Sequence, residues 1–413
     1  MSVRQEMPQD EFVSGKVLRK LLQQQPTPFY LYDAEKLRDA CRRLQQAFSW
    51  NEGFAVCFPV RMNPNPAVLH VLKDAGCRFL CASEAELRLA RLAQAEGADM
   101  IYAPFVLDEH AAAYAGRIGA AQLTDGPHAI PPQPPEHVFL SVNPGGRLQM
   151  GGRTVWNFEK SKLGMPVEEL LPMCRRFQAG GAKSIGLTVF LRDQELDTAR
   201  FLAAQQMLLR LSVRLYEEHG LRADSLMICG GLGAGYRAAD KAPELSEISA
   251  RVKNDYEEIL HSTGLRPRLI LAEGRLLAAQ AGVLVTRVQA VKEQPSPLVV
   301  LDADCAQFLR EIAFGANHPL TAPLVPQSRA MRMVRVAGSL CDLRDHFAAS
   351  CVLPELKFGE CVLICGAGAD GRSFASNYGG SLGCAEFLLD SGEIRCIRKR
   401  QSMQQLLDSF SAD

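Results

Sequence analysis

Residues 54–69, FAVCFPVRMNPNPAVL, decide how the rest of the chain is interpreted. The apolar run 54–60 has no alternation of polar and apolar side chains, which is typical of a strand buried on both faces. Arg61 follows this run, and Pro64 and Pro66 come soon after it. Proline suits the first turn of a helix because its missing N–H costs nothing there. The stretch therefore predicts a buried strand whose carboxyl end, where α/β barrels keep their chemistry, carries a charged residue.

The composition is that of an ordinary globular protein, with 413 residues of which 47% are apolar and 22% charged. Lys plus Arg and Asp plus Glu number 46 each, so no net charge favours nucleic acid or an anionic membrane. No apolar run approaches the roughly 20 residues of a membrane span. The first residues, MSVRQEMPQDEF, contain no apolar signal-peptide core. We therefore expect a cytoplasmic protein that binds neither nucleic acid nor membrane.

The cysteines do not form a recognisable framework. There are thirteen, scattered along the chain, with no CxxC pair and no HExxH motif. An odd number inside apolar runs favours small buried residues over disulfides or a metal site. We expect no metal.

Eight apolar, strand-like runs alternate with helix-like stretches before residue 280. The runs are 54–60, 78–83, 100–105, 121–125, 137–143, 184–191, 225–231 and 268–274. One helical stretch begins at Ser83 with Glu86 three residues later, a capping-box pattern, and another ends at Gly220. Eight strand–helix units predict a (β/α)8 TIM barrel, with an open doubly wound sheet as the alternative.

After about residue 280 the pattern changes to short strands separated by Pro, Gly and Asp turns, which predicts an antiparallel β-sandwich domain. A further strand is expected at Phe29–Tyr32. The predicted organisation is an N-terminal segment, 1–29, that contributes to the β domain, a barrel over 30–280, and the β-sandwich over 281–413.

The stretch 54–69 resembles the AVKAN-x-x-P-x-V-L signature of the fold-type III pyridoxal-phosphate decarboxylases, the ornithine, diaminopimelate and arginine decarboxylase family. Further blocks resemble that family's motifs in the same order: FYLYDAEKLRDACRRLQQAF (29–48), SVNPG (141–145), SKLGMP (161–166), CGGLGAGY (229–236), AEGRLLAAQAGVLVTRV (272–288) and the segment 338–378. The resemblance implies an alanine-racemase-like barrel, then a β-sandwich, in a dimer. It also implies that the first strand of the sandwich comes from the N-terminus.

The resemblance places the family's catalytic positions at Arg61, Cys341 and Asp342. In the family a lysine at the first position forms the Schiff base with the cofactor. Guanidinium keeps its proton, so Arg61 cannot take that role. Cys341 and Asp342 match the pair that reaches the neighbouring subunit's active site, which favours a retained dimer.

The cofactor-binding positions are also altered. The family's EPGR block is AEGR here, with Ala272 in the place of the glutamate that protonates the pyridine nitrogen. Glu273 is the next residue, and neighbouring residues of a strand point to opposite faces, so we do not expect it to substitute. The block continues with Gly274 and Arg275.

Three further cofactor contacts of the family have counterparts in this chain. Phe190 stands at the ring-stacking histidine, Asp193 at a serine, and Asp370 at a tyrosine that contacts the phosphate. The glycine loop has lost its first glycine to cysteine. Its remaining glycines, whose amides cradle an anion in such loops, are Gly230, Gly231 and Gly233.

The replacements predict a protein that does not bind pyridoxal phosphate. We interpret it as a catalytically inactive pseudoenzyme that serves as a partner or regulator, in a homodimer or in a heterodimer with an active paralogue. The alternatives are a cofactor-independent enzyme or binding protein that uses the old barrel cavity for a charged small molecule, and an unusual active amino-acid decarboxylase.

Overall fold

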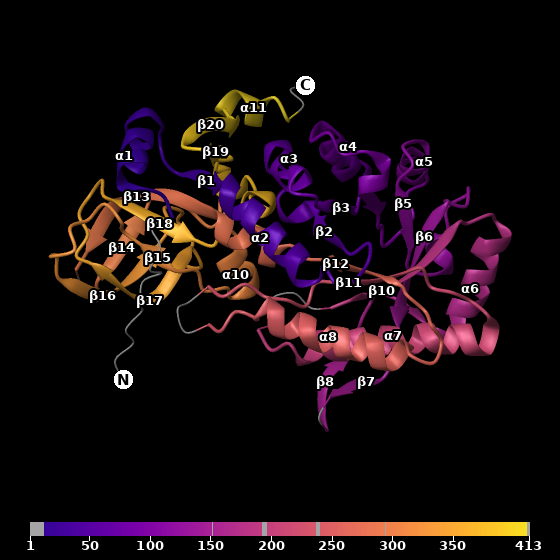
Figure 1. Ribbon diagram of the computed structural model, residues 1–413. Helices are drawn as coiled ribbons and strands as arrows, with labels where there is room; N and C mark the ends of the chain where they lie inside the picture. The colour runs from indigo at the N-terminus through magenta and orange to yellow at the C-terminus, as the bar shows by residue number, and fades with distance from the viewer. Residues whose placement is uncertain (1–11, 151, 192–195, 237–239, 294, 411–413) are drawn as a thin grey trace. The chain divides into compact units, whose positions relative to one another are not determined.

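The computed structural model describes residues 12–150, 152–191, 196–236, 240–293 and 295–410 (Figure 1). The chain forms two compact units. The barrel unit comprises residues 38–234 and 242–277, and the β unit comprises the described residues of 1–37, 235–241 and 278–413.

The barrel unit contains a closed sheet of eight parallel strands. They are β2 (Ala55–Pro59), β3 (Arg78–Cys81), β4 (Met100–Tyr102), β5 (Ala121–Thr124), β6 (His137–Asn143), β10 (Ser184–Phe190), β11 (Ser225–Cys229) and β12 (Arg268–Ala272). The sheet closes because β12 pairs with β2 and β10 pairs with β6. Each strand lies within one of the eight predicted runs. The predicted (β/α)8 barrel is confirmed, and the open-sheet alternative is wrong.

The helices follow the strands around the outside of this sheet (Figure 1). They are α2 (Ala34–Ala47), α3 (Pro66–Asp74), α4 (Glu84–Leu92), α5 (Glu109–Arg117), α6 (Val167–Ala179), α7 (Ala199–His219) and α8 (Leu245–Leu260). Ser83 caps α4 by accepting a hydrogen bond from the Glu86 N–H at 3.2 Å. Gly220 ends α7 in the left-handed conformation, with φ +67°, which glycine adopts without steric cost.

After β6 the chain adds a hairpin, β7 (Arg147–Met150) with β8 (Arg153–Asn157), and a short strand β9 (Met165–Pro166) that pairs with β6.

Alternate side chains of the eight strands fill the barrel interior, as a period of two requires. The interior cluster contains Ala55, Cys57, Leu80, Ile101, Leu123, Phe139, Met227, Cys229, Ile270 and Ala272. One close approach involves Gly186 of β10, where an added Cβ would lie 2.5 Å from Cδ1 of Phe139. Glycine is therefore needed there for β10 and β6 to pair around a bulky ring.

The β unit is built on strands in the order β17-β16-β14-β13-β1-β19-β20, with β18 pairing β13 and β15. Their bounds are β1 (Phe29–Asp33), β13 (Gly282–Lys292), β14 (Leu298–Leu301), β15 (Leu320–Thr321), β16 (Met331–Ala337), β17 (His346–Pro354), β18 (Cys361–Cys365), β19 (Ala385–Asp390) and β20 (Glu393–Arg398). The helices of this unit are α1 (Gly15–Gln24), α10 (Arg310–Phe314) and α11 (Met403–Leu407); α9 (Arg275–Ala278) lies at the change of unit.

The expected β-sandwich domain is present, with one difference in pairing. Most strand pairs are antiparallel, but β1 pairs with β19 and β14 pairs with β16 in parallel. The strand β1 lies between β13 and β19, so the N-terminal segment contributes it to this unit. The units divide at 37/38 and 277/278, whereas the sequence boundaries stood at 29/30 and 280/281, because β1 extends to Asp33.

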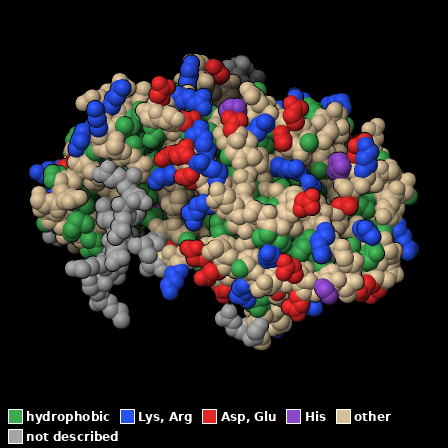
Figure 2. Space-filling view, viewed as in Figure 1, with side chains coloured by type: hydrophobic (Ala, Val, Ile, Leu, Met, Phe, Trp, Pro, Cys, Tyr) green, Lys and Arg blue, Asp and Glu red, His purple; other side chains and the backbone are tan. Residues whose placement is uncertain are grey.

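The thirteen cysteines are free, and most of them are buried; Cys341 and Cys396 are exposed. Within the described ranges, no group of His, Cys, Asp or Glu is arranged to hold a metal ion. A search of the same residues finds no helix with the length and apolarity to cross a membrane. On the face seen in Figure 2, basic and acidic side chains both occur over the whole visible surface.

We predict that Gly186→Ala destabilises the barrel unit because the new methyl group meets the ring of Phe139. Overpacking of this kind costs about 1–3 kcal/mol, which corresponds to a fall of roughly 2–10 °C in the thermal midpoint. The matched control is Gly116→Ala on α5, where the nearest atom to an added Cβ is 3.8 Å away. The control midpoint should stay equal or rise, and an unchanged midpoint for Gly186→Ala would contradict the close packing.

Candidate functional site

Arg61 lies at the carboxyl end of β2, in the short 3-10 turn η1 (Val60–Met62). Its two neighbours in the turn are buried, but Arg61 itself is exposed. Asn65 then caps α3 by accepting a hydrogen bond from the Ala67 N–H at 3.0 Å, with Pro66 as the first helical residue. The turn therefore presents the guanidinium at the end of the barrel where the strands finish.

Arg61 interacts electrostatically with Glu86 of α4. Burial raises the pKa of Glu86, while the Ala82 N–H, which donates to its carboxylate at 2.8 Å, and the Arg61 charge oppose that rise. Arg61 therefore acts on its surroundings as a fixed positive charge.

Two predicted positions face the interior near the carboxyl end of the strands. Ala272, the last residue of β12, is 1% exposed and packs in the interior cluster beside Cys57 and Cys229. Phe190, the last residue of β10, is half-buried against the same cluster. This end of the interior therefore offers the methyl group of Ala272, two thiols and an aromatic ring. None of these side chains is a carboxylate.

Glu273 is buried, and its carboxylate turns to the glycine loop rather than to the interior cluster. Its Oε1 accepts a hydrogen bond from the Leu232 N–H at 3.3 Å, and its own N–H donates to the Cys57 carbonyl at 3.0 Å. The structure thus brings two predicted segments together, AEGR and the glycine loop.

Gly274 and Arg275 are the last two residues of the AEGR block, 272–275. A Cβ at Gly274 would lie 2.4 Å from Cγ of Met62, so the turn that carries Arg61 packs directly on this glycine. Arg275 begins α9, is half-buried and has its own interaction partner.

The glycine loop after β11 has amide groups suited to an anion. Gly230 and Gly231 have φ values of +74° and +107°, a region that favours glycine. The Gly230 N–H donates to the Ala272 carbonyl at 2.8 Å, and Leu232 is bonded to Glu273. No partner within the described part of the chain is assigned to the N–H groups of Gly231 and Gly233. Two such amides in one loop can hold an anion.

The remaining predicted residues belong to the β unit or are not described. Cys341 is exposed, and the carboxylate of Asp342 accepts hydrogen bonds from the side chains of Arg344, at 2.8 Å, and Tyr378, at 2.5 Å. These two donors hold the pKa of Asp342 well below its usual range. Asp370 is 3% exposed with φ +56°, and Asp193 lies outside the described residues.

The structure also shows a group of side chains that the sequence interpretation missed. In loops beyond β4, β5 and β6, the Lys162 ammonium lies 4.8 Å from the Phe105 ring centroid, and His128 Nε2 lies 3.2 Å from the Phe105 carbonyl oxygen. Asp125, which is 4% exposed, accepts from the Gly164 N–H at 2.8 Å, and burial raises its pKa. The only signal in the sequence was that these residues come after predicted strands. Many other residues do so too, so this signal does not single them out.

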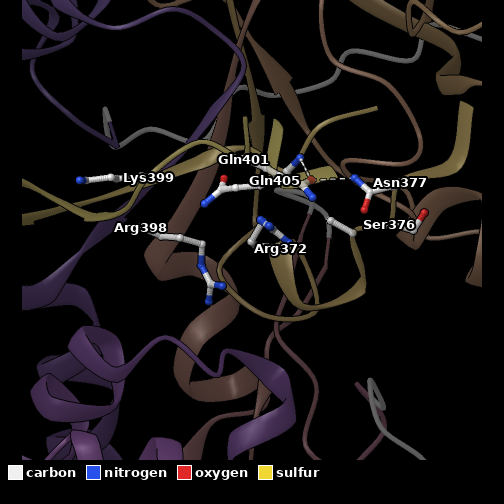
Figure 3. Close-up of a pocket in the computed structure, with 9 residues that line it drawn as sticks. Arg372, Ser376, Asn377, Arg398, Lys399, Gln401 and Gln405 are labelled. Atoms are coloured by element: carbon white, nitrogen blue, oxygen red, sulfur yellow. Dashed lines mark hydrogen bonds between the residues drawn. The ribbon is translucent and has the colours of Figure 1, made fainter. Parts of the chain in front are cut away.

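A polar cavity of about 370 Å³ lies in the β unit, lined by Arg372, Ala375, Ser376, Asn377, Gly383, Arg398, Lys399, Gln401 and Gln405 (Figure 3). Gln401 is held there by hydrogen bonds to its Oε1 from Asn377, at 2.7 Å, and from the Gly383 N–H, at 3.0 Å. Figure 3 shows Arg398 and Lys399 extending away from that pair, so these cationic groups do not converge on one ligand position.

Comparisons with known proteins cover nearly the whole chain. Residues 34–279 match the family model described as the pyridoxal binding domain of pyridoxal-dependent decarboxylases. Protein TabA of Pseudomonas amygdali pv. tabaci is 30% identical over 390 residues, covering 94% of this chain and 91% of TabA. Diaminopimelate decarboxylase of Methanothermobacter thermautotrophicus is 26% identical over 402 residues, covering 96% and 94%.

Solved structures share the fold. The diaminopimelate decarboxylase from M. jannaschii, in complex with L-lysine, superposes with a TM-score of 0.87 at 22% identity, covering 95% of this chain and 94% of its own. The Helicobacter pylori enzyme, also with L-lysine, gives 0.83 at 22% identity, covering 95% and 98%. These structures share the architecture of a barrel followed by a β-sandwich.

Proposed function

Because the chain belongs to the pyridoxal-dependent decarboxylase family, we propose that it is a catalytically inactive member that acts as a partner or regulator of another protein. The observation that carries the proposal is Arg61 at the family's lysine position, at the carboxyl end of β2. A lysine amine can lose its proton and attack an aldehyde, but a guanidinium keeps its proton and delocalises its lone pairs. The position supplies a charge without a nucleophile.

The residues present fit only part of pyridoxal phosphate. The amides of Gly231 and Gly233, to which the described residues offer no assigned partner, suit its phosphate, and the Phe190 ring packs against the interior cluster. Its aldehyde has no amine at Arg61, and its ring nitrogen has no carboxylate at Ala272. The chain therefore lacks both groups that would make the cofactor reactive.

Glu273 does not repair this loss in the structure. Its carboxylate is bonded to the Leu232 N–H, in the loop that carries these two amides. A carboxylate beside a phosphate position adds like-charge repulsion. The placement of Glu273 therefore supports weak cofactor binding. It does not support a role for Glu273 as the acid at the ring nitrogen.

A second candidate function is a cofactor-independent enzyme or a small-molecule-binding protein that uses the old barrel cavity. The amides of Gly231 and Gly233 and the exposed charge of Arg61 support this candidate, since all three attract anions. A third candidate, an unusual active amino-acid decarboxylase, rests on the names of the relatives alone.

The partner role needs an interface, and the segment around Cys341 offers one. Leu343 is 94% exposed, and Asp342 beside it is held by Arg344 and Tyr378. A single exposed leucine is ordinary on a protein surface, so the support for an interface comes from the resemblance, which places Cys341 and Asp342 in the pair that reaches the neighbouring subunit. We propose that this segment contributes to a homodimer or to a heterodimer with a lysine-bearing paralogue.

Leu343→Glu should weaken this assembly, because it places a charge where an apolar side chain is to be buried. Light scattering across a dilution series should show dissociation at least tenfold more readily than for the unchanged protein. The matched control is Leu92→Glu on α4, which starts from 72% exposure. A protein that is monomeric at all concentrations, alone and with candidate paralogues, would contradict the proposed interface.

Added pyridoxal phosphate should form no internal aldimine in the barrel of the purified protein, because no amine stands at position 61. Absorbance should be the sum of protein and free cofactor, and no decarboxylation of ornithine, lysine, arginine or diaminopimelate should be detected. Borohydride reduction followed by peptide mass spectrometry provides the decisive readout. A pyridoxyl group trapped on any barrel residue, Lys162 included, would overturn the proposal.

Arg61→Lys alone should not restore turnover. The ring nitrogen would still face Ala272, and Asp193 and Asp370 would put like charges where the family contacts the phosphate. Each such pair at a few ångströms costs on the order of several kcal/mol at an effective dielectric near 20, which lowers affinity by about two orders of magnitude or more.

The fourfold variant Arg61→Lys, Ala272→Glu, Asp193→Ser, Asp370→Tyr should bind the cofactor more tightly than Arg61→Lys, measured by absorbance titration. Arg61→Gln is the matched control for loss of the charge without gain of an amine. If Arg61→Lys alone gives a yellow protein that turns over, the site lacked only its lysine and the proposal fails.

A further inference from the structure

The amino-terminal end of the barrel, opposite the carboxyl ends of the strands, contains a cavity of about 800 Å³. It lies within the barrel unit and is lined by residues that begin the strands, by α5 and by the segments 118–120 and 131–136. Those used below are Arg78 of β3, Ala121 of β5, His137 of β6, Ser184 of β10, Ser225 of β11 and Arg268 of β12. A cavity of this size is in the range of small-molecule sites.

On the strand side of the cavity, the first layer of interior side chains contains small residues. Arg78 and Arg268 stand two residues before Leu80 and Ile270, which belong to the interior cluster, so the strand period directs all four to the same side. Barrels usually fill each layer with bulky branched side chains. Ala121, Ser184 and Ser225 are too small to do so.

Arg78 and Arg268 enter this space from strands on either side of β2, because β3 and β12 both pair with it. The Arg268 Nη2 donates to the Ser225 hydroxyl at 3.3 Å, but its buried Nε has no hydrogen-bond partner among the described residues. No hydrogen bond or ion pair is assigned to the side chain of Arg78 within the described ranges. Two guanidinium groups thus line one cavity.

The surrounding acids form no ion pair with these two arginines in the described part of the chain. Glu109 of α5 lines the cavity itself, and no ion pair is assigned to it among the described residues. Asp224 lies near Arg268, but its Oδ2 accepts from the Ile185 N–H at 2.8 Å and it makes no ion pair with either arginine in the described part of the chain. Glu136, at the cavity wall, pairs with Lys183 at 2.8 Å. Burial, followed by the charge of Arg78, lowers the pKa of Arg268, while Cys57 and Asp224 oppose that shift. Three arginines, Arg78, Arg117 and Arg268, line the cavity, and they outnumber its two acidic residues.

We propose that this cavity is a binding site for a small oxoanion, a carboxylate or a phosphate, held by Arg78 and Arg268. The planar guanidinium fork matches both groups and gives charge-assisted hydrogen bonds. The hydroxyls of Ser184 and Ser225 line the same space as further donors, and Phe139 and Ile270 provide an apolar wall for the carbon skeleton of a larger ligand. The site is independent of the chemistry at the carboxyl end, because it lies at the other end of the same strands.

The test is titration calorimetry of the full chain with inorganic phosphate and, separately, with succinate, with sodium chloride holding the ionic strength constant. We expect saturable binding of at least one probe, and the tighter probe identifies the class of the natural ligand. Arg78→Gln and Arg268→Gln should each weaken that binding tenfold or more. The matched control is Arg266→Gln, an exposed arginine two residues from Arg268, which should bind like the unchanged protein.

Two further readouts separate loss of the site from loss of the fold. Without an anion, Arg78→Gln should have a thermal midpoint equal to or above that of the unchanged protein, because a repulsive pair is removed. Ala121→Leu should fill the cavity and abolish binding while both arginines remain. If neither probe binds, or if the arginine variants and Ala121→Leu bind as the unchanged protein does, the proposal is overturned.

Discussion

The pairing of β10 with β6 is the interaction on which the arrangement of the barrel depends, because it closes eight parallel strands into a ring. Closure fixes which face of each strand points inward, so alternate side chains of every strand face the same interior. The pairing runs from Ser184 opposite His137 to Thr188 opposite Ser141, and it passes Gly186, which leaves space for the Phe139 ring. The register set there decides which residues reach the axis at both ends.

The two ends of the barrel have different chemistry as a result. At the carboxyl end the interior positions are Ala272, Cys229 and Phe190, which are small or apolar. At the amino end two arginines reach into a layer that barrels normally pack with aliphatic side chains. The two arginines at the amino end lie far along the strands from the carboxyl end, where α/β barrels keep their chemistry.

A shift of one residue has a large effect in such a sheet, and the AEGR block illustrates it. Ala272 faces the interior cluster, whereas the carboxylate of the next residue, Glu273, points to the other side, as the strand period requires. There it accepts from the Leu232 N–H and ties β12 to the glycine loop. The Glu273 carboxylate is thus a structural link, and Arg61 supplies a positive charge at the carboxyl end of β2.

The sequence by itself determined the eight strands, the barrel, the cap at Ser83, the end of α7 at Gly220 and the absence of a lysine at position 61. These features are local: they depend on a repeat of two or 3.6 residues, on capping residues, or on one side chain in a motif. Only the tertiary structure decided that β1 lies parallel to β19, that Glu273 meets Leu232, and that Arg78 and Arg268 share a cavity. Those contacts join residues far apart in the chain, and strand register and barrel closure, which bring them together, leave no mark in any single stretch of sequence.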